Sequence, residues 1–313
     1  VLGDLMSYLG AKIGDEVKKE KKSPIKPGSV MEIATKNVIT IPTTSTIMSA
    51  MKTMIKYSFR RLPITDPGTK RLEGIITGMD IVNFLGGGEK HKIVEGRYNN
   101  NLLAAVNEEV KEIMEKEVVA IDFTSSWEDA LEILLEKGVG GAPIIDRDDT
   151  VIGIITERDI MKFLAERREY DGVVEDYMTR GVITAEPNTK IEEAMKTMVS
   201  KKIRRLPVVK DGLLVGILTS TTIVHYFAGE VFKELVTGNA KEALEQPISV
   251  ILSNKKILKY TEPLVVSPKT NLRDVVNLML EKNQAAALVV SSGSLEGIIT
   301  ERDLMKFLCE AKC

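Results

Sequence analysis

The chain has 313 residues, of which 43% are hydrophobic and 28% are charged, which is enough for two domains of ordinary size. Its net charge of −2 gives no global attraction to nucleic acid or to an anionic membrane, and no apolar stretch approaches the length of a membrane span. The two cysteines, Cys309 and Cys313, lie together at the C-terminal end and cannot cross-link the fold, so we expect a reducing, cytoplasmic location.

The first 29 residues stand apart from the remainder of the chain. Apolar residues recur there at helical spacing, and a lysine-rich run with two prolines follows: Leu2, Leu5, Met6, Leu9, Ile13, Val17, Pro24 and Pro27. We therefore expect an amphipathic helix and a linker over residues 1–29. The spacing favours a helix that packs on its own protein over one that docks a partner or a second copy.

One sequence pattern occurs four times after residue 29, and its clearest part is a Gly-apolar-apolar-Thr segment. The four copies occupy residues 74–80, 153–159, 216–222 and 297–303, and three of them end in Asp. The residues upstream align without a gap when Ile47, Trp127, Ile191 and Leu272 are set in register. A repeat of this kind indicates an architecture of four similar units.

Each repeat is predicted to form a β-α-β-β-α unit, so the fold class is α+β. A β-rich run comes first, at residues 38–41, 118–121, 182–184 and 264–266. A helix follows, and the expected N-caps are Ser45, Ser126, Thr189 and Thr270. Thr189 and Glu192 have the spacing of a capping box. Two strands come next, and a second helix begins at the Thr of the repeated segment.

The separation of the repeats predicts how the chain is divided. Successive Gly residues of the repeated segment lie 79, 63 and 81 residues apart, which indicates two pairs of repeats. Linkers within the pairs absorb the extra length, and residues 102–114 are expected to be partly helical. The predicted division is the first repeat at 30–85, a linker at 86–117, the second repeat at 118–170, the third at 171–227, a linker at 228–263 and the fourth at 264–313.

The repeated Thr-x-x-Asp turn has two interpretations. Taken once, a Thr at a helix N-cap and an Asp at N3 form a helix start and nothing more. Recurrence at one place in a repeated unit favours a ligand site, because a carboxylate can accept both hydroxyls of a ribose diol and a helix N-terminus suits phosphate. The candidate ligand-binding residues are Thr77, Asp80, Thr156, Asp159, Thr219, Thr300 and Asp303.

Two Arg pairs add positive charge at the start of the second strand of a repeat. Arg60 and Arg61 in the first repeat align with Arg204 and Arg205 in the third, whereas glycines 140–141 and alanines 285–286 hold these places in the others. The pairs could protect a solvated strand edge. The same slot in two repeats favours contact with phosphate, for which Arg provides forked, permanently charged donors.

These motifs resemble the CBS domain, a family named after cystathionine β-synthase, and four copies cover nearly everything from Val30 onward. The resemblance implies clefts that bind adenosine-containing ligands, with the Thr near phosphate and the Asp on ribose. It also implies strand-one contacts to adenine, at Thr40, Ile41, Thr184 and Ala185. The third repeat departs from the pattern because Thr222 replaces the Asp, so a weak, altered or empty site is expected there.

Four repeats with no other domain also resemble the γ subunit of AMP-activated protein kinase and archaeal stand-alone proteins of that type. Residues 79–88 and 103–107 contribute to this likeness. It implies two modules packed face to face into a disc with pseudo-twofold symmetry. It also implies an energy sensor in which AMP, ADP and ATP compete for the clefts and an unidentified protein partner is regulated.

Other functions remain open at the level of sequence. A sensor of S-adenosylmethionine or methylthioadenosine would keep the adenosine contacts but has no use for the Arg pairs. A nucleic-acid-binding or scaffold protein is favoured only by basic runs such as residues 201–205, because the chain has no basic excess. An enzyme is the weakest hypothesis: His91 and His225 have no second candidate ligand nearby, so we expect no catalytic residues, metal site or catalytic cofactor.

Overall fold

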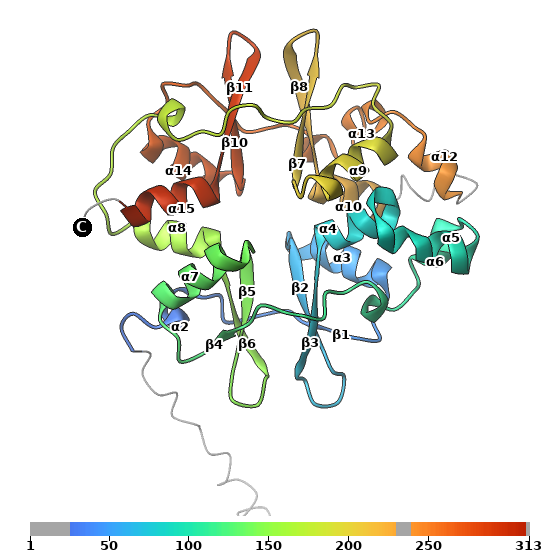
Figure 1. The fold of residues 1–313 in the computed structure, drawn as a ribbon, viewed down its shortest axis with the longest axis horizontal. Coiled ribbons are helices and arrows are strands. Elements are labelled where there is room, and N and C mark those ends of the chain that lie inside the picture. Colours follow the sequence, from blue (N-terminus) through green and yellow to red (C-terminus); the bar gives the residue numbers. More distant parts are fainter. Residues whose placement is uncertain (1–25, 230–238, 311–313) are drawn as a thin grey trace, which may run out of the picture.

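Four similar units surround a common centre in the computed structural model, which describes residues 26–229 and 239–310 (Figure 1). The first and second repeats form the lower half of the view and the third and fourth form the upper half. The β-hairpins point away from the centre, and helices from the two halves meet at the midline. Residues 1–25 of the predicted N-terminal helix and linker lie outside the described residues. Within the described ranges, no helix combines the length and apolar content that crossing a membrane requires.

Each repeat contains a first helix, an antiparallel hairpin and a second helix. The elements are β1 (Ile41–Pro42), α3 (Ile47–Tyr57), β2 (Arg61–Thr65), β3 (Leu72–Thr77) and α4 (Gly78–Val82) in the first repeat; β4 (Ile121–Asp122), α7 (Trp127–Lys137), β5 (Gly141–Ile145), β6 (Val151–Thr156) and α8 (Glu157–Ala165) in the second; α9 (Ile191–Ser200), β7 (Arg205–Lys210), β8 (Leu213–Thr219) and α10 (Ser220–Ala228) in the third; and β9 (Val265–Val266), α14 (Leu272–Glu281), β10 (Ala286–Ser291), β11 (Ser294–Thr300) and α15 (Glu301–Glu310) in the fourth.

Short helices connect these units. They are α2 (Val30–Ile33), the π-helical turn η1 (Asn83–Gly87), η2 (Glu89–His91), α5 (Lys92–Tyr98), α6 (Leu102–Ala105), η3 (Val110–Glu112), η4 (Val174–Asp176), α12 (Ala240–Leu244), α13 (Ser249–Leu252) and η5 (Leu258–Tyr260). The π-helical turn extends the second helix of the first repeat. It bends at Gly86, whose φ of 154° favours glycine, and a Cβ there would lie 2.8 Å from Leu244 Cδ1.

The first strand of each repeat is shorter than predicted. β1, β4 and β9 contain two residues each and pair parallel to the hairpin, and the third repeat has only a bridge between Ala185 and Val208. The residues before these strands run as extended chain instead. They reach the partner repeat of the same module, where Thr35 pairs with Ile154 and Thr179 with Ile298. This crossing places one repeat's leading segment against the other repeat's hairpin.

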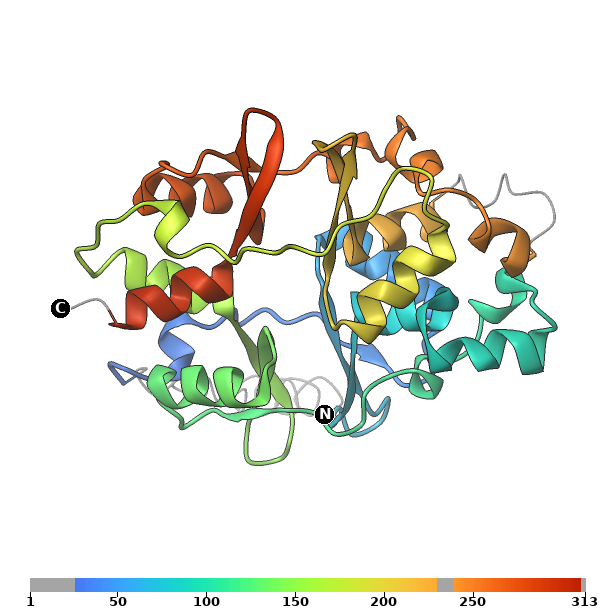
Figure 2. The same cartoon turned by 45° about the horizontal axis from the view of Figure 1, so that its top comes forward.

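The segments before the second and fourth repeats pair in turn with the hairpins of the first and third repeats. In the first module, Glu115 pairs with Ile75 of the first repeat. In the second, the Ile217 amide donates to the Thr261 carbonyl at 3.1 Å. Figure 2 shows the connection from the second repeat to the third passing beside the β10–β11 hairpin before it reaches α9. Each hairpin is therefore bordered by a segment of the other repeat in its module.

Three of the predicted N-caps of the first helices are wrong by one position. Ser126 caps α7, as predicted, and also forms a capping box with Asp129, but Thr46, Lys190 and Asn271 precede the other helices. Thr189 forms no capping box with Glu192, because its hydroxyl accepts a hydrogen bond from the Glu186 amide at 3.1 Å and closes the preceding turn. Thr270 does the same with the Ser267 amide at 3.0 Å.

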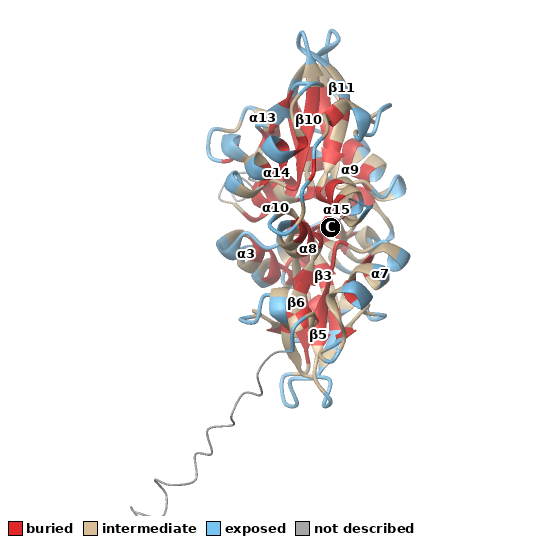
Figure 3. Ribbon diagram, turned by 90° about the vertical axis from the view of Figure 1, so that its left-hand side faces the viewer, coloured by how far each residue is buried: buried red, intermediate tan, exposed pale blue. Residues whose placement is uncertain are grey.

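The hydrophobic core crosses the boundary between the modules. One buried cluster joins the first and third repeats, through residues such as Met51 and Phe227, and another joins the second and fourth, through Ile160 and Leu304. In Figure 3 the buried residues fill the middle of the molecule and the hairpin tips are exposed. α8 packs against α15, α4 against α10 and η1 against α9, so the two modules are packed into one body.

Candidate functional site

The Thr-x-x-Asp turn of the second repeat combines a helix cap with a carboxylate oxygen that is not used by the cap. The Thr156 amide and hydroxyl donate to Asp159 Oδ2 at 2.9 and 2.8 Å, and the Asp159 amide donates back to the hydroxyl at 3.3 Å. Within the described residues, Asp159 Oδ1 has no hydrogen-bond partner. The fourth repeat repeats this geometry at Thr300 and Asp303, with distances of 2.9, 2.8 and 3.3 Å. Capping and ligand binding are thus compatible.

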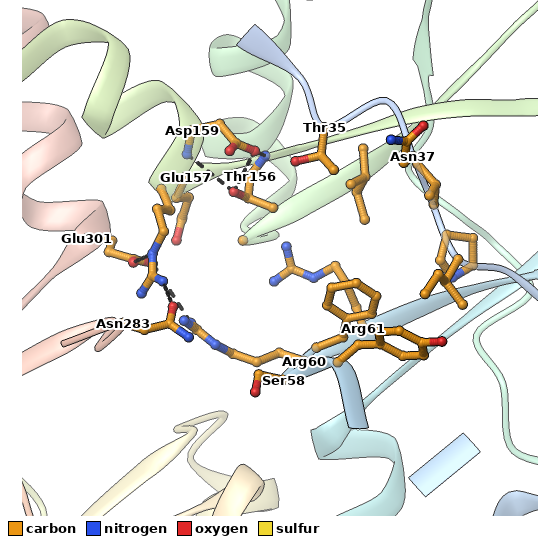
Figure 4. A pocket seen from close by; sticks show the side chains of 18 of the residues that line it. Thr35, Asn37, Ser58, Arg60, Arg61, Thr156, Glu157, Asp159, Asn283 and Glu301 are labelled. Carbon is orange, nitrogen blue, oxygen red and sulfur yellow. Dashed lines mark hydrogen bonds and ion pairs between the residues drawn. The ribbon is translucent and has the colours of Figure 1, made fainter. Parts of the chain in front are cut away.

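A cavity of about 310 Å³ opens at this turn, and we call it the repeat-two cleft. Thr156 and Asp159 lie on one wall and Arg60 and Arg61 extend from the opposite wall (Figure 4). Apolar and aromatic side chains line the space beside them: Val38, Ile39, Tyr57, Phe59, Pro63 and Ile154. The rings of Tyr57 and Phe59 stack with their centroids 5.5 Å apart. The cleft therefore offers a carboxylate, an apolar slot and guanidinium groups in one space.

None of the four predicted strand-one residues lines the repeat-two cleft. Val38 and Ile39 line it, whereas Thr40 follows them and Ile41 is buried in β1. In the third repeat Thr184 is exposed and Ala185 is buried against the hairpin.

Glycines create the space for the arginines. A Cβ on Gly140 would lie 2.7 Å from Arg204 Nη1 and 2.9 Å from Arg61 Nη2, and a Cβ on Gly141 would collide with the Arg61 guanidinium. The alternation of Arg pairs with small residues along the sequence thus has a steric cause. Arg204 comes from the third repeat, so the other module contributes a cation to the repeat-two cleft.

Reciprocal ion pairs flank the arginines at the interface of α8 and α15. Arg158 pairs with Glu301, and Arg302 pairs with Glu157, across the pseudo-twofold axis. Arg60 Nη1 lies 3.8 Å from Glu301 Oε2. The sequence signal for these pairs was present, because the second and fourth repeats share the run Thr-Glu-Arg-Asp, but we did not predict them.

The remaining arginines carry charge that no carboxylate neutralises directly. Within the described part of the chain, Arg61, Arg204 and Arg205 form no ion pair. Burial, followed by the repulsion of Arg204 and Arg60, lowers the pKa of Arg61 to about 10. Burial, followed by Arg60 and Arg204, lowers the pKa of Arg205 to about 10. All of them stay cationic at neutral pH, so this centre is suited to an anion.

Burial also acts on the carboxylate end of the cleft. It raises the pKa of Asp159, and the hydrogen bonds from Thr156 offset only part of this effect. A hydrogen-bond donor placed on Oδ1 would favour the ionised form.

The first repeat has the same turn but its carboxylate is occupied. Thr77 donates to Asp80 Oδ2 from its amide and hydroxyl, at 2.7 and 2.9 Å. Asp80 Oδ1 accepts from Lys90 Nζ at 2.6 Å, and Lys90 also donates to the Ile113 carbonyl at 2.6 Å. Lys90 thus holds the oxygen that stays available in the second and fourth repeats, and sequence reasoning missed it.

The third repeat has no carboxylate at this turn, because Thr222 stands in the place of the Asp. The Thr222 hydroxyl lies 2.8 Å from that of Thr219 and donates to the Tyr260 carbonyl at 2.9 Å. The Tyr260 ring stacks on His225 with centroids 3.7 Å apart, and burial, with a smaller effect of Lys259, lowers the pKa of His225 to about 4. A cavity of about 340 Å³ adjoins this turn, and we call it the repeat-three cleft.

Known proteins identify the repeated unit. The family model of the CBS domain matches residues 30–87, 110–166, 174–229 and 257–310. The chain belongs to the CBS domain family. This confirms the predicted family and the four-repeat α+β fold.

Two archaeal relatives match most of the chain. The protein MJ1225 of Methanocaldococcus jannaschii is 37% identical over 283 residues, which span 89% of this chain and 98% of the relative. A 33.4 kDa protein from a ribosomal RNA operon of Thermofilum pendens is 29% identical over 273 residues, 87% and 88% of the two chains.

Solved structures agree with this assignment. The crystal structure of MJ1225, described as a proposed archaeal homologue of γ-AMPK, matches with a TM-score of 0.82 at 36% identity, over 89% of this chain and 99% of that one. A Pyrococcus horikoshii protein matches with a TM-score of 0.54 at 21% identity, over 90% and 99%, and shows the fold alone.

Among residues 26–229 and 239–310, no three His, Cys, Asp or Glu side chains come together as metal ligands. His91 Nδ1 lies 2.8 Å from the Phe84 carbonyl oxygen. Cys309 is a free thiol, and Cys313 lies outside the described residues.

Proposed function

We propose that this CBS protein is a regulator that binds adenine nucleotides, AMP, ADP or ATP, in the repeat-two cleft. The observation that carries the proposal is one cavity with an unpartnered carboxylate oxygen, on Asp159, and guanidinium groups without ion pairs, on Arg61 and Arg204. A nucleotide has the complementary pattern, because its ribose diol donates to carboxylates and its phosphates accept from Arg.

The orientation of the ligand follows from these two ends. The ribose hydroxyls would donate to Asp159 Oδ1, the base would lie against Val38, Ile39 and Ile154, and the phosphates would extend toward Arg61 and Arg204. AMP, ADP and ATP share the first two contacts and differ in the third, so they would compete for one cleft. The fourth repeat, with Thr300 and Asp303, is the second site that we propose.

Regulation would arise because residues of both modules would contact one bound ligand. Arg204 belongs to the third repeat, so a bound phosphate would be shared across the interface between the modules. A ligand shifts a conformational equilibrium only to the extent that it binds the two states differently, and the length of the phosphate chain supplies such a difference. The description of MJ1225 as a proposed γ-AMPK homologue supports a role in which an unidentified protein reads this state. We propose no catalytic step.

Parallel calorimetric titrations test the proposal. AMP, ATP, adenosine and S-adenosylmethionine are titrated separately and in competition, at two salt concentrations. We expect AMP and ATP to compete, and AMP to bind more tightly than adenosine, with the difference reduced at high salt. Binding of S-adenosylmethionine alone would identify a different sensor, because its sulfonium cation gains nothing from Arg61. No binding of any of the four would contradict a ligand-binding role.

A further inference from the structure

The repeat-three cleft lies next to the repeat-two cleft and shares part of its wall. Arg60, Arg204, Ser58 and Asn283 line both cavities. Arg205 lines only the repeat-three cleft, and Arg61 only the repeat-two cleft. These two arginines occupy equivalent positions in their repeats, so they provide a matched pair that distinguishes the cavities.

The ribose-binding feature is absent from the repeat-three cleft. Thr222 replaces the Asp, and its hydroxyl is held by the Tyr260 carbonyl and the Thr219 hydroxyl at 2.9 and 2.8 Å. The ring of Tyr260 stacks on His225 beside this contact. No carboxylate is therefore positioned to accept a diol at this turn.

Cationic side chains dominate the lining instead. Arg60, Arg204 and Arg205 lie inside, and Lys259 and Lys282 lie exposed at the rim, whereas Glu262 is the one carboxylate among the residues that line the cavity. Arg204 and Arg205 form no ion pair in the described ranges. The hydroxyls of Thr219, Ser220 and Thr221 and the amide of Gln284 add further donors to the lining.

We propose that the repeat-three cleft binds a condensed phosphate, either inorganic pyrophosphate or the phosphate chain of a nucleotide, without recognising a ribose. A condensed phosphate places several acceptor oxygens and negative charges within a short span, and forked Arg donors match this arrangement. The lowered pKa of Arg205, about 10, leaves it charged at neutral pH. The site goes beyond the adenosine recognition proposed above and does not depend on it.

Phosphate groups bound in the two clefts would compete for the arginines that line both. Arg60 and Arg204 can direct their guanidinium groups to one phosphate chain at a time. A triphosphate in the repeat-two cleft and a condensed phosphate in the repeat-three cleft therefore exclude each other, whereas a single phosphate near Arg61 leaves more of the shared wall available.

Calorimetry with sodium pyrophosphate at constant ionic strength tests the site in the full chain. Arg205→Gln is expected to weaken pyrophosphate binding at least tenfold, and Lys282→Gln at the exposed rim by about threefold. Arg61→Gln is the matched control and is expected to change it less than twofold. A thermal melt of each variant verifies folding, and Lys282→Gln remains informative if Arg205→Gln unfolds.

Competition separates the two sources of the phosphate. In Asp159→Asn, displacement of pyrophosphate by ATP but not by AMP would assign the phosphate chain of a nucleotide, and failure of both to displace it would assign the inorganic anion. No pyrophosphate binding, or binding that responds to Arg61→Gln and not to Arg205→Gln, would overturn the proposal. AMP titrations are read separately, so failure here leaves the adenosine site untouched.

Discussion

The replacement Asp159→Asn removes one charge from the repeat-two cleft and changes its shape very little. The amide oxygen of Asn can still accept the cap from the Thr156 amide, so the start of α8 is preserved. The oxygen that lacks a partner, Oδ1, becomes either an NH₂ group or a neutral acceptor. The ribose hydroxyls then lose their hydrogen bonds to a carboxylate.

The expected loss follows from the strength of these bonds. A hydrogen bond to a charged group contributes about 1.5–3 kcal/mol, and part of this is already offset because burial disfavours the ionised carboxylate. We expect AMP and adenosine affinities to fall by about 1.5–3 kcal/mol, which is about 10- to 150-fold. Isothermal titration calorimetry at pH 7.5 measures both ligands.

Asp80→Asn is the control, because it alters the same motif in a repeat whose carboxylate is bound to Lys90. We expect less than a twofold change in affinity there.

The raised pKa of Asp159 also sets the sign of the pH effects. The folded state holds this proton more tightly than the unfolded chain, so ionisation at neutral pH lowers stability, and Asp159→Asn should melt at the same temperature or higher.

Affinity for adenosine should fall as the pH is lowered through the raised pKa of Asp159, because the protonated carboxyl accepts the diol poorly. Asp159→Asn should abolish this pH dependence. Equal effects of Asp159→Asn and Asp80→Asn, or unchanged affinity in Asp159→Asn, would refute the reasoning and leave Asp159 as a helix cap.

Three further predictions concern other parts of the molecule. Lys90→Met frees Asp80 Oδ1, so calorimetry should find one additional adenosine equivalent bound at saturation. Gly141→Ala places a methyl group against the Arg61 guanidinium, so AMP should bind at least fivefold more weakly while adenosine binds as before. His225→Phe keeps a ring in the stack but removes a group whose pKa is lowered from 6.5 to about 4. Because the unfolded chain takes up this proton first, the free energy of unfolding of the wild type falls as the pH drops from 6.5 to about 4. The variant should lose up to about 3 kcal/mol less over the same pH range.

Each of these predictions has a result that would contradict it. An unchanged adenosine stoichiometry in Lys90→Met would mean that the first repeat has no cleft behind its carboxylate. Gly96→Ala, where a Cβ meets nothing within 4 Å, is the control for Gly141→Ala, and equal AMP affinities in the two would exclude the steric role of Gly141. Parallel stability curves for wild type and His225→Phe would show that His225 titrates alike in both states.

The sequence predicted the features that depend on local pattern. The Thr at the repeated turn caps the second helix in the first three repeats, and the same cap distances recur at Thr300, because capping needs only residues three positions apart. The alternation of Arg pairs with small residues was also visible, and the structure adds its cause, the steric room that Gly140 and Gly141 give the guanidinium groups.

Contacts between distant segments could not be predicted in the same way. Lys90 reaches Asp80 because the π-helical turn redirects the chain, and Tyr260 reaches Thr222 from a separate connecting segment. Arg204 enters the repeat-two cleft only because the modules pack through α8, α15, α4 and α10. One-residue errors at Thr189 and Thr270 have a different cause, since each hydroxyl could bond either the helix or the preceding turn.

A crystal structure of the protein soaked or grown with AMP tests the central claim most directly. We predict AMP in the repeat-two cleft, with its ribose hydroxyls on Asp159 Oδ1 and its phosphate in contact with Arg61 or Arg204. The first repeat, where Lys90 holds Asp80, should lack the ligand. AMP bound in the first repeat with the repeat-two cleft empty, or with its phosphate turned away from the arginines, would contradict the account.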